Sequence, residues 1–465
     1  DGAANFAADV TFADGADIIT ASAGTSNFRA GVNAGNSIES GGNYNTVVGD
    51  EAGTAITTGD YSTFVGYAAG DATTTGLDNT ALGALALTSN TVGAYNVAIG
   101  QSALHNNVDG SNSVAIGRLA LYAQDPASAV DMYNTAVGYL TGTSVTTGRL
   151  NTLIGGLSAD SLTVGERNTA VGAVALGADT QGSRSVAVGN SALAVQNFTS
   201  ATDTYNTAVG YDAGKSVSTG TSNTLIGGLA GDAQTTASNN TAVGYASLGT
   251  NTTGAGNVAV GRESLFNNTT ASNNTAVGLN SLYTNTTGAN NVAVGKDALI
   301  ASTTANNNTA VGYDCLQANT TGHSNVGVGK SALEANTTAS ENTAVGMNAL
   351  AANTTGDLNV AIGGNALQAN VAGDRAVAIG YQALAVQNPS GNVDTYNVAI
   401  GLNSQSNTTT GINNVAVGGA SLAANTTASN NTAVGSAALT ANTTGASNTA
   451  VGYSAVAANT TGIQN

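Results

Sequence analysis

The most regular feature of the chain is a short alternation of polar and apolar positions that returns every seventeen residues. The phrase Asn-Thr/Val-Ala-Val-Gly ends at Gly244, Gly261 and Gly278, and both intervals between these glycines are seventeen residues. The same glycine can be followed from Gly49 to Gly452 in steps of seventeen, with three steps of twenty-one. Repeats this short are half or less of the usual helical repeat units, so each is expected to form one turn of a solenoid.

Within a turn, the pattern predicts one short strand. If the Asn of the phrase is position 1, the glycine is position 5, position 2 is Thr or Val, position 3 is almost always Ala, and position 4 is Val, Ile or Leu. Because side chains alternate along a strand, positions 2 and 4 share one face and position 3 lies on the other. Position 4 never becomes polar, so its face is predicted to point inward and the alanine face outward.

The glycine at position 5 is expected to form a corner, where a positive φ or a close backbone approach excludes a Cβ atom. The most regular corner glycines are Gly244, Gly261, Gly278, Gly295 and Gly312. A second short strand is predicted after the corner, with a small residue at position 8 and Leu at position 9. The segments "NTTG" and "NTTA" then suit a polar turn.

Composition favours β-structure over disorder or helix. Only 8% of residues are charged and two are proline, whereas disordered chains are normally rich in both, and Val, Ile and Thr are abundant. The high Gly, Asn and Thr content and the lack of a 3.6-residue stripe disfavour helices. The sequence therefore predicts an all-β fold: a parallel β-solenoid of about 24 turns over residues 27–465, after a β connector or cap over residues 1–26.

The small side chains of each turn also bear on assembly. A turn offers few apolar side chains, mostly Ala and Val with one Leu, so its core is thin and would gain stability from a partner surface. The alanine face is smooth and small enough for close packing. We therefore expect a homotrimeric fibre.

Charge and motifs narrow the possible functions. The net charge of −17 argues against nucleic acid as a partner, and no apolar run approaches the ~18 residues of a membrane span, so no membrane insertion is expected. His105 and His323 occupy different slots of the repeat, and Cys315 stands at position 8, which suits a small buried residue. Calcium-binding nonapeptides, a nucleophile elbow, a phosphate-binding loop and metal-spaced Cys or His are missing. We expect no catalytic site, cofactor or metal.

Three turns are four residues longer, over residues 118–138, 190–210 and 381–401, and they resemble one another. Extra residues can only bulge outward if the ladder continues on both sides, and loops on a rigid scaffold are where binding usually lies. The alternative is that they are tolerated insertions copied with their block. The candidate receptor contacts in these turns are Tyr122, Asp125, Pro126, Asn197, Phe198, Asn388 and Pro389.

Threonine pairs recur in the polar turn, as in Thr252–Thr253 and Thr269–Thr270. Stacked hydroxyl groups could form an ice-binding surface, and the alternative is turn-forming threonine with satisfied hydroxyl groups. Asn251, Asn268 and Asn285 also match the Asn-x-Thr acceptor motif, which leads to glycosylation only in a host that has the enzymes.

The phrases "NTAVGYASLGTNTTGAGNVAVG", "NTLIGGLAGDA" and "NSVAIG" resemble repeats of tail-fibre and adhesin-like proteins from marine phages and bacteria. Many such chains end in a self-cleaving intramolecular chaperone of the S74 peptidase type. "NSVAIG" at 112–117 is also similar to the head repeat of YadA-like trimeric autotransporter adhesins, which is shorter. The resemblance covers roughly residues 27–465.

The resemblance implies the shaft of a phage tail fibre, on the virion and outside the cell. Its expected partners are copies of itself, other tail or fibre proteins, and a glycan or protein of the host surface. A bacterial trimeric surface adhesin and an ice-binding solenoid are the alternatives.

Overall fold

The computed structural model describes residues 22–465, and these form two compact units. Unit 1 contains residues 1–190 and 197–203, of which 1–21 lie outside the described residues, and unit 2 contains residues 191–196 and 204–465. The expected connector over residues 1–26 lies almost wholly outside the described part, and residues 22–26 form no strand. No helix occurs between residues 22 and 465, which confirms an all-β chain over that range.

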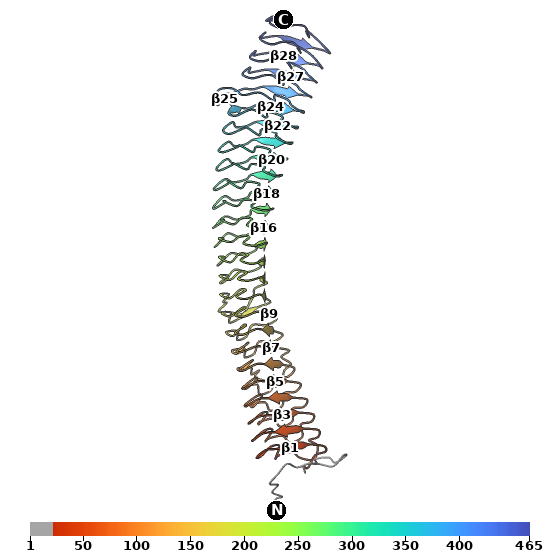
Figure 1. Cartoon of the computed structure of the whole chain (residues 1–465), viewed down its shortest axis with the longest axis vertical. Coiled ribbons are helices and arrows are strands. Elements are labelled where there is room, and N and C mark those ends of the chain that lie inside the picture. Colours follow the sequence, from red (N-terminus) through yellow and green to blue (C-terminus); the bar gives the residue numbers. More distant parts are fainter. Residues whose placement is uncertain (1–21) are drawn as a thin grey trace, which may run out of the picture. The chain divides into compact units, whose positions relative to one another are not determined.

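In unit 1, ten three-residue strands pair in parallel, each with the equivalent strand of the neighbouring turn (Figure 1). They are β1 (Phe28–Ala30), β2 (Thr46–Val48), β3 (Thr63–Val65), β4 (Thr80–Leu82), β5 (Val97–Ile99), β6 (Val114–Ile116), β7 (Thr135–Val137), β8 (Thr152–Ile154), β9 (Thr169–Val171) and β11 (Val186–Val188). A separate short pair joins β10 (Gly182–Ser183) to β12 (Thr202–Asp203).

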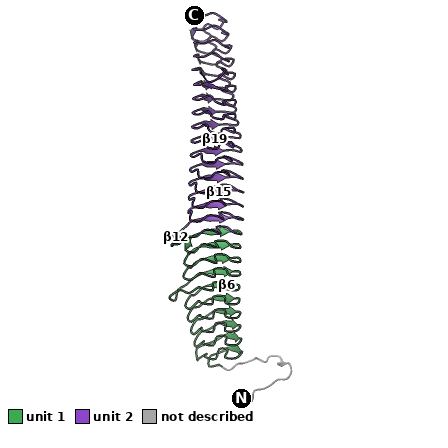
Figure 2. Cartoon of the chain, turned by 90° about the vertical axis from the view of Figure 1, so that its left-hand side faces the viewer, with its two compact units in different colours: residues 1–190, 197–203 green, residues 191–196, 204–465 purple. Residues whose placement is uncertain are grey.

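Unit 2 repeats this arrangement with fifteen three-residue strands among its described residues (Figure 2). They are β13 (Thr207–Val209), β14 (Thr224–Ile226), β15 (Thr241–Val243), β16 (Val258–Val260), β17 (Thr275–Val277), β18 (Val292–Val294), β19 (Thr309–Val311), β20 (Val326–Val328), β21 (Thr343–Val345), β22 (Val360–Ile362), β24 (Val377–Ile379), β26 (Val398–Ile400), β27 (Val415–Val417), β28 (Thr432–Val434) and β29 (Thr449–Val451). A short pair joins β23 (Gly373–Asp374) to β25 (Val393–Asp394).

Equivalent residues of successive turns stand opposite one another, as the repeat predicts. Ala242 of β15 pairs with Ala259 of β16, and Ala259 pairs with Ala276 of β17. The same register holds along both units, which gives about 25 turns of about seventeen residues over the described chain. The predicted parallel β-solenoid is confirmed within each unit.

The two faces of the strand are the reverse of the sequence-based prediction. Ala242 and Ala259 are fully buried, whereas Val243 and Val260 at position 4 are only half-buried. The reason is the space available inside the coil. In most turns the leucine at position 9 leaves room only for alanine at position 3, whereas the turn that has Leu225 at position 3 has Gly231 at position 9, where an added Cβ would lie 2.8 Å from Leu225 Cδ2. The valines therefore face outward.

The predicted second strand is also wrong, because turns follow the corner. In the turn that begins at Asn240, Ala246 and Leu248 have left-handed φ values of 52° and 51°, and no regular strand forms there. The backbone still bonds to both neighbouring turns, through Ala246 N–H to Gly228 O at 3.0 Å and Leu248 N–H to Ser264 O at 3.0 Å. A circuit of seventeen residues must reverse direction within a few residues, and turns do this where a straight strand cannot.

In most turns the leucine of position 9 is the largest side chain of this narrow core. Leu248, Leu265 and Leu282 are fully buried behind the alanines of position 3. The left-handed backbone at this position is unfavourable for leucine, and burial of the side chain together with the bonds to neighbouring turns offsets that preference. Each turn therefore depends on its neighbours for its shape.

The corner glycines have the predicted conformation. Gly244, Gly261, Gly278, Gly295 and Gly312 have φ values of +133° to +142°. A Cβ atom on any of them would lie 2.3–2.5 Å from the carbonyl oxygen of the next corner glycine. Both reasons for glycine, the positive φ and the close backbone approach, therefore apply at this position.

Candidate functional site

Asparagines stack inside the coil at position 1 of most turns and in shorter runs at position 12, and the sequence analysis did not predict these ladders. At position 1, the Asn257 backbone N–H donates to Asn240 Oδ1 at 2.8 Å, and its side-chain amide donates to Ala271 O at 2.9 Å. At position 12, Asn268 Nδ2 donates to Asn251 Oδ1 at 2.9 Å. All four asparagines are buried. The regular return of Asn to positions 1 and 12 was the signal that could have revealed these ladders.

The ladder at position 12 contains the acceptor-motif asparagines. The side-chain amides of Asn251, Asn268 and Asn285 each donate to the carbonyl oxygen three residues later, at 2.9, 3.0 and 2.9 Å. Their exposed fraction is 0%. In the folded chain these nitrogens are therefore inaccessible to a glycosylating enzyme.

The threonine pairs divide into two roles. Thr252 Oγ1 donates to Thr269 O at 3.0 Å, and Thr269 Oγ1 donates to Thr286 O at 3.1 Å. The first threonine of each pair thus satisfies its hydroxyl group on the neighbouring turn, as expected for turn-forming threonine. The second, as at Thr253 and Thr270, is exposed.

Each long turn has one buried apolar residue among the candidate contacts. Pro126, Phe198 and Pro389 occupy the same place in the three turns, and all three are buried. A methyl group on Gly110 would lie 3.2 Å from Pro126 Cγ, and one on Gly373 would lie 2.8 Å from Pro389 Cγ. These side chains are packed against the coil, and their role as receptor contacts stays a prediction.

The other candidates lie on or near the surface of the long turns. Asp125, Asn197 and Asn388 are exposed, and Tyr122 is half-buried against His105 with ring centroids 5.0 Å apart. Their role as receptor contacts stays a prediction.

Each long turn ends in the sequence Asp-x-Tyr, which forms a polar cluster on the surface. In the first, Tyr133 Oη donates to Asp131 Oδ2 at 3.2 Å, and this hydrogen bond is the main cause that raises the pKa of Tyr133. In the third, Asp394 pairs with Arg375 at 3.0 Å and accepts from Tyr396 Oη at 3.0 Å. Backbone bonds beside this cluster, such as Thr395 N–H to Asp374 O at 3.0 Å, link the end of the long turn to the neighbouring turn.

The remaining candidates for chemistry are the cysteine and the two histidines. Cys315 is fully buried at position 8, and burial raises the pKa of its thiol to about 12. His105 belongs to unit 1 and His323 to unit 2. Between residues 22 and 465, no three His, Cys, Asp or Glu side chains gather as metal ligands would, and no helix there could cross a membrane.

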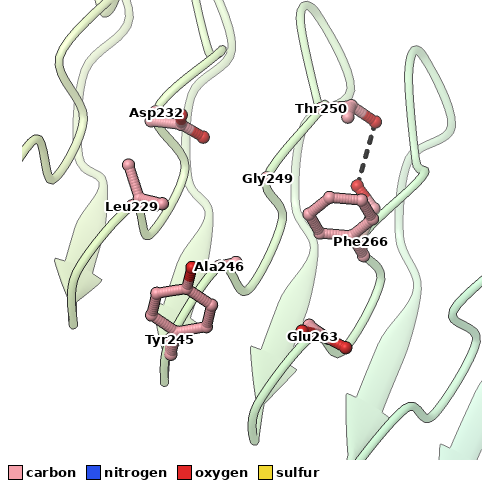
Figure 3. Close-up of a pocket in the computed structure, with 8 residues that line it drawn as sticks. All are labelled: Leu229, Asp232, Tyr245, Ala246, Gly249, Thr250, Glu263 and Phe266. Carbon is pink, nitrogen blue, oxygen red and sulfur yellow. Dashed lines mark hydrogen bonds between the residues drawn. The ribbon is translucent and has the colours of Figure 1, made fainter.

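One hollow in unit 2 has the features of a small binding site (Figure 3). It measures about 300 Å³ and is lined by Leu229, Asp232, Tyr245, Ala246, Gly249, Thr250, Glu263 and Phe266. The hollow exists because successive turns carry Asp232, Gly249 and Phe266 at position 10, and the middle turn has no side chain there. The sequence analysis missed it, although a glycine at this otherwise variable position was a visible signal.

The fold places this chain in the class of β-solenoid repeat proteins, and comparison with known proteins does not identify a family. No protein-family model matches the chain, and no curated protein is significantly similar to it. The resemblance of the repeats to tail-fibre and adhesin-like proteins therefore stays a prediction.

Proposed function

We propose that the chain is a structural shaft, most consistent with a homotrimeric phage tail fibre that holds or supplies contacts to the host surface. The observation that carries this proposal is the unbroken register within each unit. Fifteen turns in unit 2 stacked at about 4.8 Å would extend roughly 70 Å, and each turn bonds to the next through backbone and asparagine side chains. Such stacking resists bending and suits a mechanical role.

The outward valine face is the proposed contact between chains, in place of the alanine face expected from the sequence. Position 4 forms one row that includes Val243, Val260 and Val277, whose side chains are half-buried. Other side chains of the row are more exposed, and the exposed fraction of Ile226 is 39%. A continuous apolar row is typical of an interaction surface. Three copies related by an axis along the stack would place identical rows together, and the partner is therefore a second and third copy of the chain.

Host contact is assigned to the exposed residues of the long turns. Asp125 and Asn388 project from turns that Pro126 and Pro389 fix against the coil, so their positions are held by buried neighbours. Polar groups of this kind can form hydrogen bonds with a glycan or a protein surface.

Measurement of the native mass tests the assembly. Light scattering should show a particle with the mass of three 45.1 kDa chains. The mass of a single chain would contradict the proposed trimer. Antibodies against the chain then test the location by electron microscopy of the source culture. Labelled virus tails support a tail fibre, whereas labelled bacterial envelopes support the alternative, a trimeric surface adhesin.

An ice-binding role has one observation in its favour, the exposed second threonine of the polar turn. Thr253, Thr270 and Thr287 present one such side chain per turn. Thermal hysteresis of a concentrated solution tests this role. Its absence would remove the ice-binding alternative and leave the shaft proposal intact.

A further inference from the structure

We propose that a buried glutamine at position 12 is the positioning residue of each long turn, and that it holds the exposed residues of that turn in one conformation for contact with a receptor. The three glutamines are Gln124, Gln196 and Gln387, and all are buried. The use of these turns as contacts rests on the proposed function, whereas the positioning itself does not depend on which molecule is contacted.

An ordinary turn closes its interior with two asparagines that share one carbonyl group. Asn240 at position 1 and Asn251 at position 12 both donate from their side-chain amides to Gly254 O, each at 2.9 Å. Gly254 stands at position 15 and is buried. Both asparagines therefore require the chain to stay close to the coil at position 15.

A long turn cannot supply this carbonyl group, because its chain lies further out at the same count. Ala127 and Ser390 stand fifteenth in the first and third long turns, and both are exposed. In all three long turns position 12 is glutamine, and position 1 is a residue smaller than asparagine: Ser113, Ser185 or Ala376. The smaller residue leaves space inside the coil, and glutamine has a longer reach than asparagine by one methylene group.

The glutamine side chain bonds to the first residue of the following turn. That residue is an asparagine whose side-chain amide donates to the glutamine oxygen in all three cases: Asn134 to Gln124 at 2.9 Å, Asn206 to Gln196 at 2.9 Å and Asn397 to Gln387 at 2.8 Å. In the first long turn, Gln124 Nε2 also donates to Ser113 Oγ and to Asn107 Oδ1, both at 3.0 Å. The glutamine thus joins the ladder of position 12 to the ladder of position 1 where the extra residues begin.

A glutamine in an ordinary turn provides a contrast. Gln234 also stands at position 12, in a turn of seventeen residues that begins with Asn223. Its side-chain nitrogen is buried without a hydrogen-bond partner among the described residues, and its oxygen accepts from Asn240 Nδ2 at a longer distance, 3.4 Å. Because an unpaired buried amide is unfavourable, glutamine suits position 12 of a long turn better than that of an ordinary turn.

The bond between Gln124 and Asn134 closes the base of the first long turn. The two residues are ten apart in the chain, and the segment 125–133 lies between them. Near the end of this segment, Met132 N–H donates to Ser111 O of the preceding turn at 2.9 Å. A closed base restricts the conformations of the exposed residues, so their arrangement is prepared before a receptor binds.

Hydrogen exchange of the full chain tests the assignment. Gln124→Leu removes the hydrogen bonds but keeps a side chain of similar size, and the buried Leu162 shows that position 12 accepts leucine. Exchange in the segment 125–132 is expected to become faster by about tenfold or more, because Asn134 loses a buried partner at the base of the turn. Exchange in the third long turn, over 388–395, should be unchanged.

Matched variants separate positioning from general destabilisation. Gln387→Leu should accelerate exchange over 388–395 and leave 125–132 unchanged, so the test does not depend on the folding of one variant. Gln234→Leu makes the same change in an ordinary turn and should not accelerate exchange over 235–240, because the amide nitrogen that it removes has no partner among the described residues.

The measurement uses the free chain, so failure to find a receptor would count against the proposed function and leave this result unchanged. Unaltered exchange in both long-turn variants would overturn the proposal. Equal acceleration in every turn, or in Gln234→Leu as in Gln124→Leu, would also overturn it, since either result indicates a general structural role.

Discussion

The side-chain amide of Asn268 donates to the side-chain oxygen of Asn251, one turn earlier, at 2.9 Å, and both residues are fully buried. Asn285 donates to Asn268 in the same way at 3.0 Å. The side-chain oxygens of Asn251 and Asn268 are thus satisfied by the equivalent residue of the next turn, whereas the oxygen of Asn285 has no partner among the described residues, because Ser302 replaces asparagine in the turn that follows. Because an unpaired buried amide is unfavourable, the ladder links the stability of each turn to that of its neighbours.

Replacement of Asn268 by alanine should therefore destabilise unit 2. The change leaves the Asn251 oxygen without its donor and opens space inside the coil, and a loss of about 1–3 kcal/mol in the free energy of unfolding is expected. Denaturant titration measures the loss, and hydrogen exchange should show it centred on the turns around 251–285. Asn267→Ala is the control, since its side chain is half-buried and outside the ladder.

Gly278→Ala should be strongly unfavourable. Gly278 has a φ of +136°, and a Cβ atom would lie 2.5 Å from Gly295 O, so both backbone strain and a steric clash oppose the substitution. The expected loss is at least about 1–3 kcal/mol in thermal or chemical unfolding. At Gly419 an added Cβ would meet nothing closer than 3.9 Å, so Gly419→Ala is the control. Equal stability of the two variants would contradict the close stacking of the corners.

Asp160→Asn should stabilise the fold at neutral pH. Burial raises the pKa of Asp160, so the folded state favours the neutral carboxyl group. The stabilisation from this preference is fully present below the unfolded pKa and is lost as pH rises through the folded pKa. The melting temperature of Asp160→Asn should thus exceed that of the natural sequence at pH 7, and the difference should shrink below pH 4. A larger difference in acid than at pH 7 would refute the assignment.

Cys315 should be unreactive in the folded chain. Burial raises the pKa of its thiol to about 12, so the nucleophilic thiolate is scarce at pH 8 and is also inaccessible. Iodoacetamide should label the protein only after denaturation, as intact mass spectrometry can show. The same shift predicts that stability falls as pH rises from about 9 to about 12, because the unfolded chain ionises first. Rapid labelling under native conditions would count against the buried position.

Val277→Glu tests the proposed contact between chains. Val277 lies in the outward row at position 4 and is half-buried in the single chain, so a charge there should leave the coil folded but disfavour association. Light scattering should show a shift toward smaller particles, with the circular-dichroism spectrum unchanged. Thr287→Glu adds the same charge on an exposed turn and should have no effect. If the Val277→Glu variant still forms a trimer, the contact between chains must lie on another face.

Much of the architecture was predictable because the repeat is strict. The spacing of the corner glycines correctly indicated a parallel solenoid, and their φ values match the reason given for glycine. The outline of the long turns was also predictable, since four extra residues interrupt an otherwise constant count. The burial of Pro126, Phe198 and Pro389 could not be predicted from the sequence. An apolar residue in a long turn can either be exposed as a contact or be packed against the coil.

The sequence by itself determined the period, the parallel register and the position of the corners, because a one-residue error would move every following side chain to the wrong face. Only the tertiary structure decided which face is inside. Alternation along Val258–Val260 is compatible with either choice, and the choice depends on the space left by Leu248 and its equivalents across the coil. The hollow at Gly249 was likewise decided in three dimensions, because it is bounded by residues that become neighbours only when the turns stack.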